Sequence, residues 1–421
     1  MRPMSSAPRP ARDGHRLAAR LLTGAYSVLI DQGLAGASAR SIAVRAGSSA
    51  SAIHYHFERV DELIRAALDD ARERDVRWRY AALDKLPQAA LEPALLPHFL
   101  TGVIDTAGRA FSELALLRWD VALEAALHGR FVKVACQWRE DLNAFWSAVL
   151  SSFGITASAS IVAEFADAVG RIYLVAGSGP THIAWVTETC ARCAERLCGV
   201  SLSVRKGRIW RDLHLPTVAR TPTADQSASA SSSTAHRIVD GALDVILTQG
   251  PRAMTHRAVA AAAGVSLSST TYHFASREEI LHAAFARLRA ITVARTAGPG
   301  PRPPQTLTLD ELIERMGGAL VPNAGAVSRE YLAAQSLIHA TARDAALREH
   351  AQHLYARMGE PTLHLFRLTS ELRNRSDALS AFIFALWTDA MLCNASLESA
   401  QSIAAHVRTQ QRAMLRLLFD S

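Results

Sequence analysis

Apolar residues recur at helical spacing along most of the chain. Between residues 15 and 32 they stand three or four positions apart, and Gly33 follows them, which predicts an amphipathic helix that ends at the glycine. Ser38 and Ser49 are suited to cap two shorter helices, and Gly47 between them can supply a left-handed turn. The pattern therefore predicts a long helix followed by two short ones.

The same pattern returns 217 positions later. Residues 25–67 align with residues 242–284 without a gap, and sixteen of these 43 pairs are identical. Thr255, Gly264 and Ser266 take the places of the first caps and turn, and residues 276–279 (SREE) form a capping box for a following helix. The chain is therefore predicted to be a duplication.

The repeat continues more weakly beyond these segments. Residues 119–127 resemble residues 334–342 at a shift of 215, and Asp167 resembles Asp377 at a shift of 210. A Ser, Ala, Thr and Pro tract at residues 216–234 has little to bury and predicts a flexible linker. The predicted domains of the first half are an Arg-rich flexible arm (1–14), a helix-turn-helix (HTH) unit (15–80) and a helical domain (81–205). A linker (206–234) leads to a second HTH unit (235–290) and a second helical domain (291–421).

Composition agrees with an all-α fold. The chain has 421 residues, 49% of them hydrophobic and only 6% aromatic, and Ala and Leu supply most of the apolar residues. We expect helical bundles at 95–152 and 161–199, and again at 309–368 and 377–419. Aromatic and Met side chains at helical spacing can form either ordinary core or the wall of a ligand pocket. The candidate pocket residues are Trp119, Trp138, Trp146, Tyr173, Met358, Phe384 and Trp387.

The net charge of +7 is modest, and its distribution says more than its size. Residues 1–60 hold eight arginines against three acidic residues, and residues 205–220 hold five basic residues against one. This distribution admits nucleic acid as a partner. The N-terminus is polar, and no apolar run is long enough for a membrane span, so we expect a cytoplasmic protein.

Catalytic and metal chemistry find little support in the sequence. No phosphate-binding loop, nucleophile–base pair or paired carboxylates stand at useful spacing, so we expect neither an enzyme nor a bound cofactor. Cys190, Cys193 and Cys198 have spacing that a metal site could use, but they lie in an Ala-rich helical stretch. Buried core thiols are the preferred interpretation, with a metal site as the alternative.

Two short helices joined by a glycine turn form an HTH arrangement, whose second helix can enter the major groove of DNA. The segments IAVRAGSSASAIHYHFERVDELIRAAL and VAAAAGVSLSSTTYHFASREEILHAAF, which begin at residues 42 and 259, both resemble the DNA-binding signature of the TetR family. The resemblance covers about 50 residues in each half. It implies an all-α regulator that binds double-stranded operator DNA. It also implies that the helical domains at 81–205 and 291–421 serve ligand binding and dimerisation, with a small-molecule effector bound among their helices.

The resemblance also implies which residues contact DNA. In the first unit they are Ser38, Arg40, Ser49, Ala50, Ser51, His54, Tyr55 and His56. In the second they are Thr255, Arg257, Ser266, Leu267, Ser268, Ser269, Thr271, Tyr272, His273 and Arg277. The first unit departs from the family pattern at Ser48, where Val is usual, and at Val60, where Lys is usual.

The duplication predicts how the chain assembles. The resemblance to the TetR family implies a two-fold dimeric arrangement. Because one chain here carries both halves, we expect an intrachain pseudo-dimer. Because the two HTH units present different side chains, we expect an asymmetric operator, bound by a repressor that an effector releases. A homodimer of tandem chains is the competing assembly. The competing function is a small-molecule-binding or scaffolding protein in which one HTH unit, the first by preference, no longer binds DNA.

Overall fold

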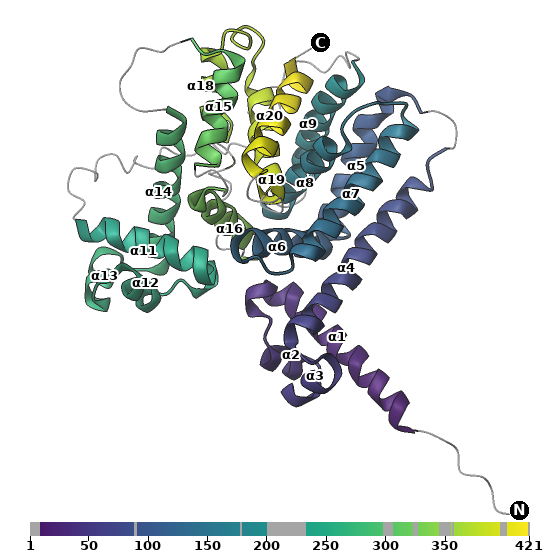
Figure 1. Ribbon diagram of the computed structural model, residues 1–421, viewed down its shortest axis with the longest axis vertical. Helices are drawn as coiled ribbons and strands as arrows, with labels where there is room; N and C mark the ends of the chain where they lie inside the picture. The colour runs from purple at the N-terminus through teal and green to yellow at the C-terminus, as the bar shows by residue number, and fades with distance from the viewer. Residues whose placement is uncertain are drawn as a thin grey trace, which may run out of the picture.

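The computed structural model describes residues 9–87, 91–176, 179–199, 233–297, 306–322, 327–344, 355, 358–395 and 402–419. Within these ranges the chain forms α-helices, two short 3-10 helices and an isolated β-bridge between Leu307 and Thr369. The predicted all-α class is confirmed (Figure 1).

The first half begins with the HTH unit and continues into a bundle. Its helices are α1 (Arg9–Gly36), α2 (Ala39–Arg45), α3 (Ala50–Phe57), α4 (Val60–Leu83), α5 (Leu96–Arg109), α6 (Ser112–His128), α7 (Val132–Ser152), α8 (Ala159–Ala176) and α9 (Pro180–Cys198).

The second half repeats this order. Its helices are α11 (Ser233–Gln249), α12 (His256–Ala263), α13 (Leu267–His273), α14 (Arg277–Ala297), α15 (Leu309–Leu320), α16 (Arg329–Arg343), α18 (Glu360–Leu368), α19 (Ala378–Ala395) and α20 (Ile403–Phe419). Helices α4 and α14 run from each HTH unit into its bundle, so the predicted boundaries at residues 80 and 290 fall within a helix.

Close helix packing in the two HTH units supports the duplication. A Cβ atom added to Gly24 of α1 would lie 2.9 Å from the Cβ of Ala46, which caps α2. A Cβ added to Gly241 of α11 would lie 2.7 Å from the backbone nitrogen of Ala263. Both pairs are separated in sequence by 22 residues, so the same glycine–alanine approach brings the first two helices together in each unit.

The N-terminal segment differs from the expected arm. Helix α1 begins at Arg9, so residues 9–14 are helical, while residues 1–8 lie outside the described residues. The backbone at Gly33 is not helical, with φ +70° and ψ −178°, so the long helix ends at this glycine as the sequence pattern predicted. A short helical segment then continues beyond the kink to Gly36. Most of the predicted linker, residues 206–232, also lies outside the described residues.

The two halves pack against each other through equivalent helices. Helix α8 lies along α19, α6 lies on α16, and α9 contacts α20 (Figure 1). A joint apolar cluster combines helices from both halves. Its buried members are Trp119, Ala122, Leu123, Val175, Ile338, Ala342 and Cys393.

One weak part of the predicted repeat was wrong. Asp167 lies in the middle of α8, whereas Asp377 precedes α19 and its Oδ1 accepts a hydrogen bond from the Ser380 backbone N–H at 2.8 Å. The two aspartates therefore occupy different positions in their halves. The shift of 210 had aligned a helix interior with a helix start, because both segments read Asp-Ala followed by apolar residues.

Cys190 and Cys193 are buried on α9, and burial raises the pKa of both thiols, that of Cys190 to about 12. Their burial agrees with the interpretation of these two cysteines as core thiols. Among the described helices, none is long and apolar enough to cross a membrane.

Candidate nucleic-acid interface

Side-chain caps shape the first HTH unit. The Ser38 hydroxyl accepts a hydrogen bond from the Ser41 backbone N–H at 3.1 Å, and the Ser41 hydroxyl accepts one from the Ser38 N–H at 2.9 Å. Ser49 caps α3 by accepting from the Ala52 N–H at 3.3 Å. Gly47 between the helices has φ +58°, a left-handed conformation that favours glycine. The predicted caps and turn are confirmed.

The second unit is built in the same way. Thr255 caps α12 through a hydrogen bond from the Ala258 N–H at 3.2 Å, and Ser266 caps α13 through one from the Ser269 N–H at 3.1 Å. Gly264, with φ +61°, makes the turn. Each unit thus presents its second short helix in a fixed orientation.

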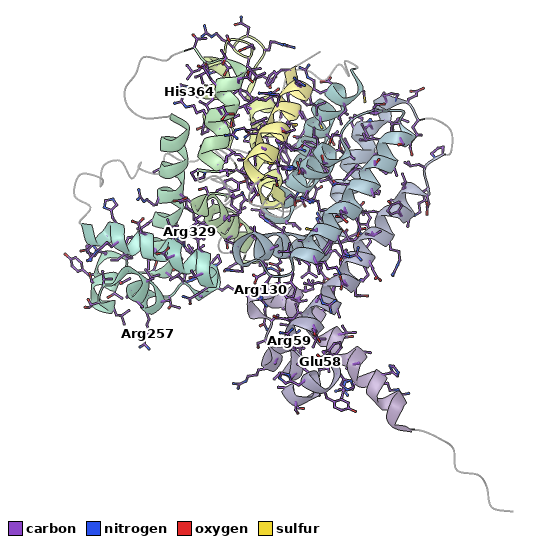
Figure 2. All side chains as sticks on the ribbon, viewed as in Figure 1. Glu58, Arg59, Arg130, Arg257, Arg329 and His364 are labelled. Atoms are coloured by element: carbon purple, nitrogen blue, oxygen red, sulfur yellow. The ribbon has the colours of Figure 1, made fainter. Side chains whose placement is uncertain are left out.

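Large and polar side chains of these helices face solvent. Tyr55 and Tyr272, which are equivalent in the repeat, are 84% and 85% exposed. Figure 2 shows Arg257 at the outer edge of the second unit, directed away from the bundles. Of the predicted DNA contacts, the exposed ones are Ser38, Arg40, Ser49, Ala50, Ser51, His54, Tyr55, Thr255, Arg257, Ser266, Leu267, Ser268, Thr271 and Tyr272. His56, Ser269, His273 and Arg277 are half-buried.

Arg277 has a structural role that the sequence did not indicate. Its Nε donates to the Met254 carbonyl and its Nη2 to the Pro251 carbonyl, both at 3.0 Å. These bonds fasten the start of α14 to the segment between α11 and α12. Val60 stands at the equivalent position in the first unit and offers no such donor, so the two units are fastened differently.

In the first unit Arg20 holds the turn by hydrogen bonds, and Glu58 has a strained backbone conformation. Arg20 donates from Nη2 to the carbonyls of Ala46 and Gly47, each at 2.7 Å, and so holds the turn onto α1. Glu58 after α3 has φ +55° and ψ −52°, which is unfavourable for a residue with a side chain. The His54 ring nitrogen Nδ1 lies 2.9 Å from the Glu58 carbonyl oxygen and helps to hold this bend.

Comparison with known proteins agrees with this geometry. The model of the family described as "Bacterial regulatory proteins, tetR family" matches the chain twice, at residues 21–67 and 238–284. The chain therefore carries the DNA-binding domain of the TetR family twice. Members of this family are DNA-binding transcription regulators and not enzymes.

No curated protein matches the chain. A crystal structure from Mesorhizobium loti, assigned to the TetR-family transcriptional regulators, is similar at 15% identity with a TM-score of 0.34, over 44% of this chain and 97% of that one.

Ion pairs connect each of the two TetR-type HTH units to the helical bundle of its own half. Arg130, at the end of α6, pairs with Asp61 of α4 at 2.9 Å and with Glu124 at 2.7 Å, and Figure 2 shows it above the first unit. Arg329 of α16 lies 3.5 Å from Asp244 of α11. These contacts join each unit to helices of its own half.

Two residues of the predicted effector pocket border cavities in the described part of the chain. Trp138 and Trp146 line small cavities of the first bundle. Trp119 packs instead between the halves, edge-on to His339 with 4.8 Å between ring centroids. Tyr173 lies against Gly108, Phe384 and Trp387 are fully buried core, and Met358 packs against that core.

A buried charge network in the first bundle was missed from the sequence. Asp75 of α4 accepts hydrogen bonds from the Trp138 indole at 2.8 Å, from Arg79 at 3.2 Å and from Arg118 at 3.0 Å. Arg118 also donates to Asp167 of α8 at 2.8 Å. Burial opposes ionisation of Asp75, but the two arginines and the indole donors hold its pKa below the usual range.

The network continues into the second half of the chain. Asp167 pairs with Arg171 at 2.6 Å, and Arg171 donates to the Cys393 thiol at 3.4 Å on α19. Burial opposes ionisation of Asp167, but Arg171 and Arg118 together lower its pKa to about 2. A network of buried charged residues thus connects α4, which follows the first HTH unit, to α19 in the second half of the protein.

Proposed function

We propose that one chain binds one asymmetric operator, with each HTH unit on its own half-site, and represses transcription until a small-molecule effector releases it. The observation that carries this proposal is the packing of α8 on α19 and of α6 on α16. This packing would give one chain the arrangement of a two-fold dimer, and both HTH units lie in the lower part of the molecule in Figure 1. A second chain is then not needed to supply the second half-site.

The exposed faces of the two recognition helices support unlike half-sites. In the alignment of the two repeats, Ala50 of α3 corresponds to Leu267 of α13, and His54 corresponds to Thr271. Leu267 is 45% exposed and can contact the methyl group of thymine, whereas the methyl group of Ala50 reaches less far. Base contacts carry sequence specificity, so the two units should prefer different bases.

The path of α4 supports release by an effector. This helix begins next to the first recognition helix and reaches the bundle interior, where Asp75 is held by Arg118 and Trp138. A ligand that alters these contacts would move the first HTH unit relative to the second. Operator affinity depends on their separation, so ligand binding and DNA binding would be coupled.

Selection from a random DNA pool by the full chain, followed by a footprint, tests the proposal. We expect a site with two unlike halves, whose binding weakens steeply with salt because phosphate contacts release counterions. Tyr272→Ala should remove protection of one half and Tyr55→Ala that of the other. Two identical, equally protected halves would contradict the asymmetric operator, and failure to select any sequence would contradict DNA binding.

One observation favours the alternative, in which the first HTH unit no longer binds DNA and the chain is a scaffolding or small-molecule-binding protein. The strained Glu58 and the contact of the His54 ring nitrogen with its carbonyl occur in the first unit, at the C-terminal end of the recognition helix. The same footprint decides between the two. The alternative predicts that Tyr55→Ala changes no protected position.

A further inference from the structure

The contact between α6 and α16 joins the two halves of the chain through buried charged groups. Asp120 of α6 is 8% exposed, and its Oδ1 atom lies 3.0 Å from the Nε2 atom of His339 on α16. Its Oδ2 atom accepts a hydrogen bond from Arg343, whose side chain is 7% exposed. The first half therefore supplies the acid of this contact, and the second half supplies its nitrogen partners.

Helices α6 and α16 occupy equivalent places in the two halves. They end at His128 and Arg343, which are 215 positions apart, the same shift at which their sequences resemble each other. Leu123 and Ile338, also 215 positions apart, both lie in the joint apolar cluster. A surface that meets its own equivalent has the geometry of an isologous dimer interface, in which each contact recurs with the two sides exchanged. The charged contact can therefore be compared with its exchanged counterpart.

The exchanged counterpart of this contact carries different groups. Gln335 of α16 donates a hydrogen bond from Nε2 to the Tyr331 hydroxyl at 3.2 Å, and Glu124 of α6 pairs with Arg130 of its own half. The two sides of the contact between α6 and α16 therefore differ in charge. All three members of the charged contact have another kind of residue at the equivalent position: Gln335 for Asp120, Glu124 for His339 and His128 for Arg343.

Pairing of like halves would place unsuitable groups opposite each other. Between two first halves, Asp120 would face Glu124 of the other copy, which sets two carboxylates against each other. Between two second halves, Arg343 and His339 would face Gln335, so the buried guanidinium would lose its carboxylate. Burying an ion without its partner, or beside a like charge, is strongly unfavourable. The charges therefore favour the pairing of a first half with a second half over both alternatives.

A second ion pair across the halves has the opposite direction. Arg192 of α9 lies 3.6 Å from Asp377, which precedes α19. Here the first half supplies the base and the second half supplies the acid, so a general excess of one charge on one half does not explain the pairing. Asp377 is 45% exposed, so this pair contributes less than the buried contact of Asp120.

We propose that Asp120, with His339 and Arg343, is the determinant that pairs a first half with a second half and rejects a second copy of the same half. The partner of the first half is accordingly the second half of the same chain, which the covalent connection keeps at a high effective concentration. Burial opposes ionisation of Asp120, but His339 and Arg343 lower its pKa and so keep the carboxylate charged. The inference goes beyond the proposed function, because it does not depend on DNA binding.

Competition between the possible pairings tests the inference. A protease site inserted into the predicted linker allows the purified, folded chain to be cut once. The cut chain is unfolded in urea and refolded at micromolar concentration, the intact chain is carried through the same steps as a control, and native mass spectrometry weighs the pairs. We expect first–second pairs to exceed like pairs by at least about a hundredfold. A statistical mixture of the three pairs would overturn the inference, as would recovery of the intact chain without any pairs from the cut one.

A transfer of the nitrogen partners onto the first half separates the effect of charge from that of shape. Glu124→His together with His128→Arg gives the first half both sides of the contact, so first–first pairs should rise at least about tenfold. Glu73→His with His98→Arg makes the same replacements at exposed positions of α4 and α5 and should leave the pairing unchanged. Equal pairing in these two variants would show that shape selects the partner, and would overturn the inference.

A measurement on the intact chain needs no refolding. Asp120→Asn and Arg343→Gln each remove one charge of the contact, and thermal unfolding compares the two variants with the double variant. We expect each single change to lower the midpoint and the double change to lower it by clearly less than their sum, because the two groups pair. Additive effects would contradict the role of this contact. Asp310→Asn, which removes an exposed acid paired with Arg412 within the second half, should barely change the midpoint.

Failure of this inference and failure of the proposed function are distinguishable. A chain that forms first–second pairs but binds no selected DNA refutes the proposed function and leaves the inference standing. A chain that binds its operator while its cut halves form like pairs freely does the reverse.

Discussion

Arg252 of the second HTH unit donates a hydrogen bond from Nη1 to the main-chain carbonyl of Gln32 in the first unit, at 2.8 Å. Gln32 lies near the C-terminal end of α1, where carbonyl groups lack helical partners and attract cations. Arg343 of α16 donates to the Ile30 carbonyl in the same region and pairs with Asp120. The second half of the chain thus holds the first DNA-binding unit directly.

Substitution Arg252→Ala should weaken binding to the complete operator. The lost hydrogen bonds leave the units less firmly oriented, so we expect a threefold to tenfold lower affinity, in line with about 1 kcal/mol for such a contact. Binding to an isolated half-site should not change. Fluorescence anisotropy with both DNAs measures this, with Arg375→Ala, an exposed arginine before α19, as the control. Equal losses on the half-site and the operator would show that Arg252 contacts DNA instead.

Substitution Gly241→Ala should destabilise the second unit. Alanine favours helix by up to about 1 kcal/mol, but its Cβ would meet the Ala263 backbone nitrogen at 2.7 Å. Since backbone cannot move away cheaply, we expect a net loss of about 1–3 kcal/mol in the free energy of unfolding. Gly102→Ala in α5, where an added Cβ meets nothing within 4 Å, should stabilise by about 0.5–1 kcal/mol. Urea denaturation compares them, and stabilisation by both changes would contradict the close approach of α11 and α12.

Glu164 should make stability fall as pH rises. Its pKa is about 8 in the folded chain and near 4.5 when exposed, so between these values the folded state binds the extra proton. The free energy of unfolding should then decrease by up to about 1.4 kcal/mol per pH unit and level off above pH 8. Glu164→Gln should lack this contribution, and Glu73→Gln on the exposed face of α4 should retain it. Parallel pH profiles for the unaltered chain and Glu164→Gln, measured by urea unfolding, would contradict the raised pKa.

Arg257 should contribute a phosphate contact. It is exposed at the start of α12, beside the Thr255 cap, where a helix N-terminus also attracts anions. Arg257→Gln should lower operator affinity by about tenfold and reduce the slope of log K against log salt by about 1. Arg375→Gln should change neither, and an unaltered slope in Arg257→Gln would remove this residue from the interface.

Local features of the fold were predictable from the sequence. Ser38, Ser49, Thr255 and Ser266 cap helices as expected, because a cap and the backbone groups it bonds lie within four residues of each other. The two HTH units could also be recognised from the sequence, because short identical segments recur at a single spacing.

Contacts between distant segments were not predictable. Arg118 stands 43 residues after Asp75 and 49 residues before Asp167, and periodicity does not say which charged residues will meet inside a bundle. One signal was available: Asp167 and Arg171, four residues apart, stand with Glu164 in a largely apolar helix. The structural role of Arg277 was hidden because its partners are backbone carbonyls, which leave no mark in the sequence.

Light scattering of the chain bound to its selected operator tests the central claim most directly. The account predicts one chain of 45.5 kDa per DNA duplex, with protection of two half-sites that differ in sequence. Two chains per duplex, each protecting an identical half-site, would contradict it.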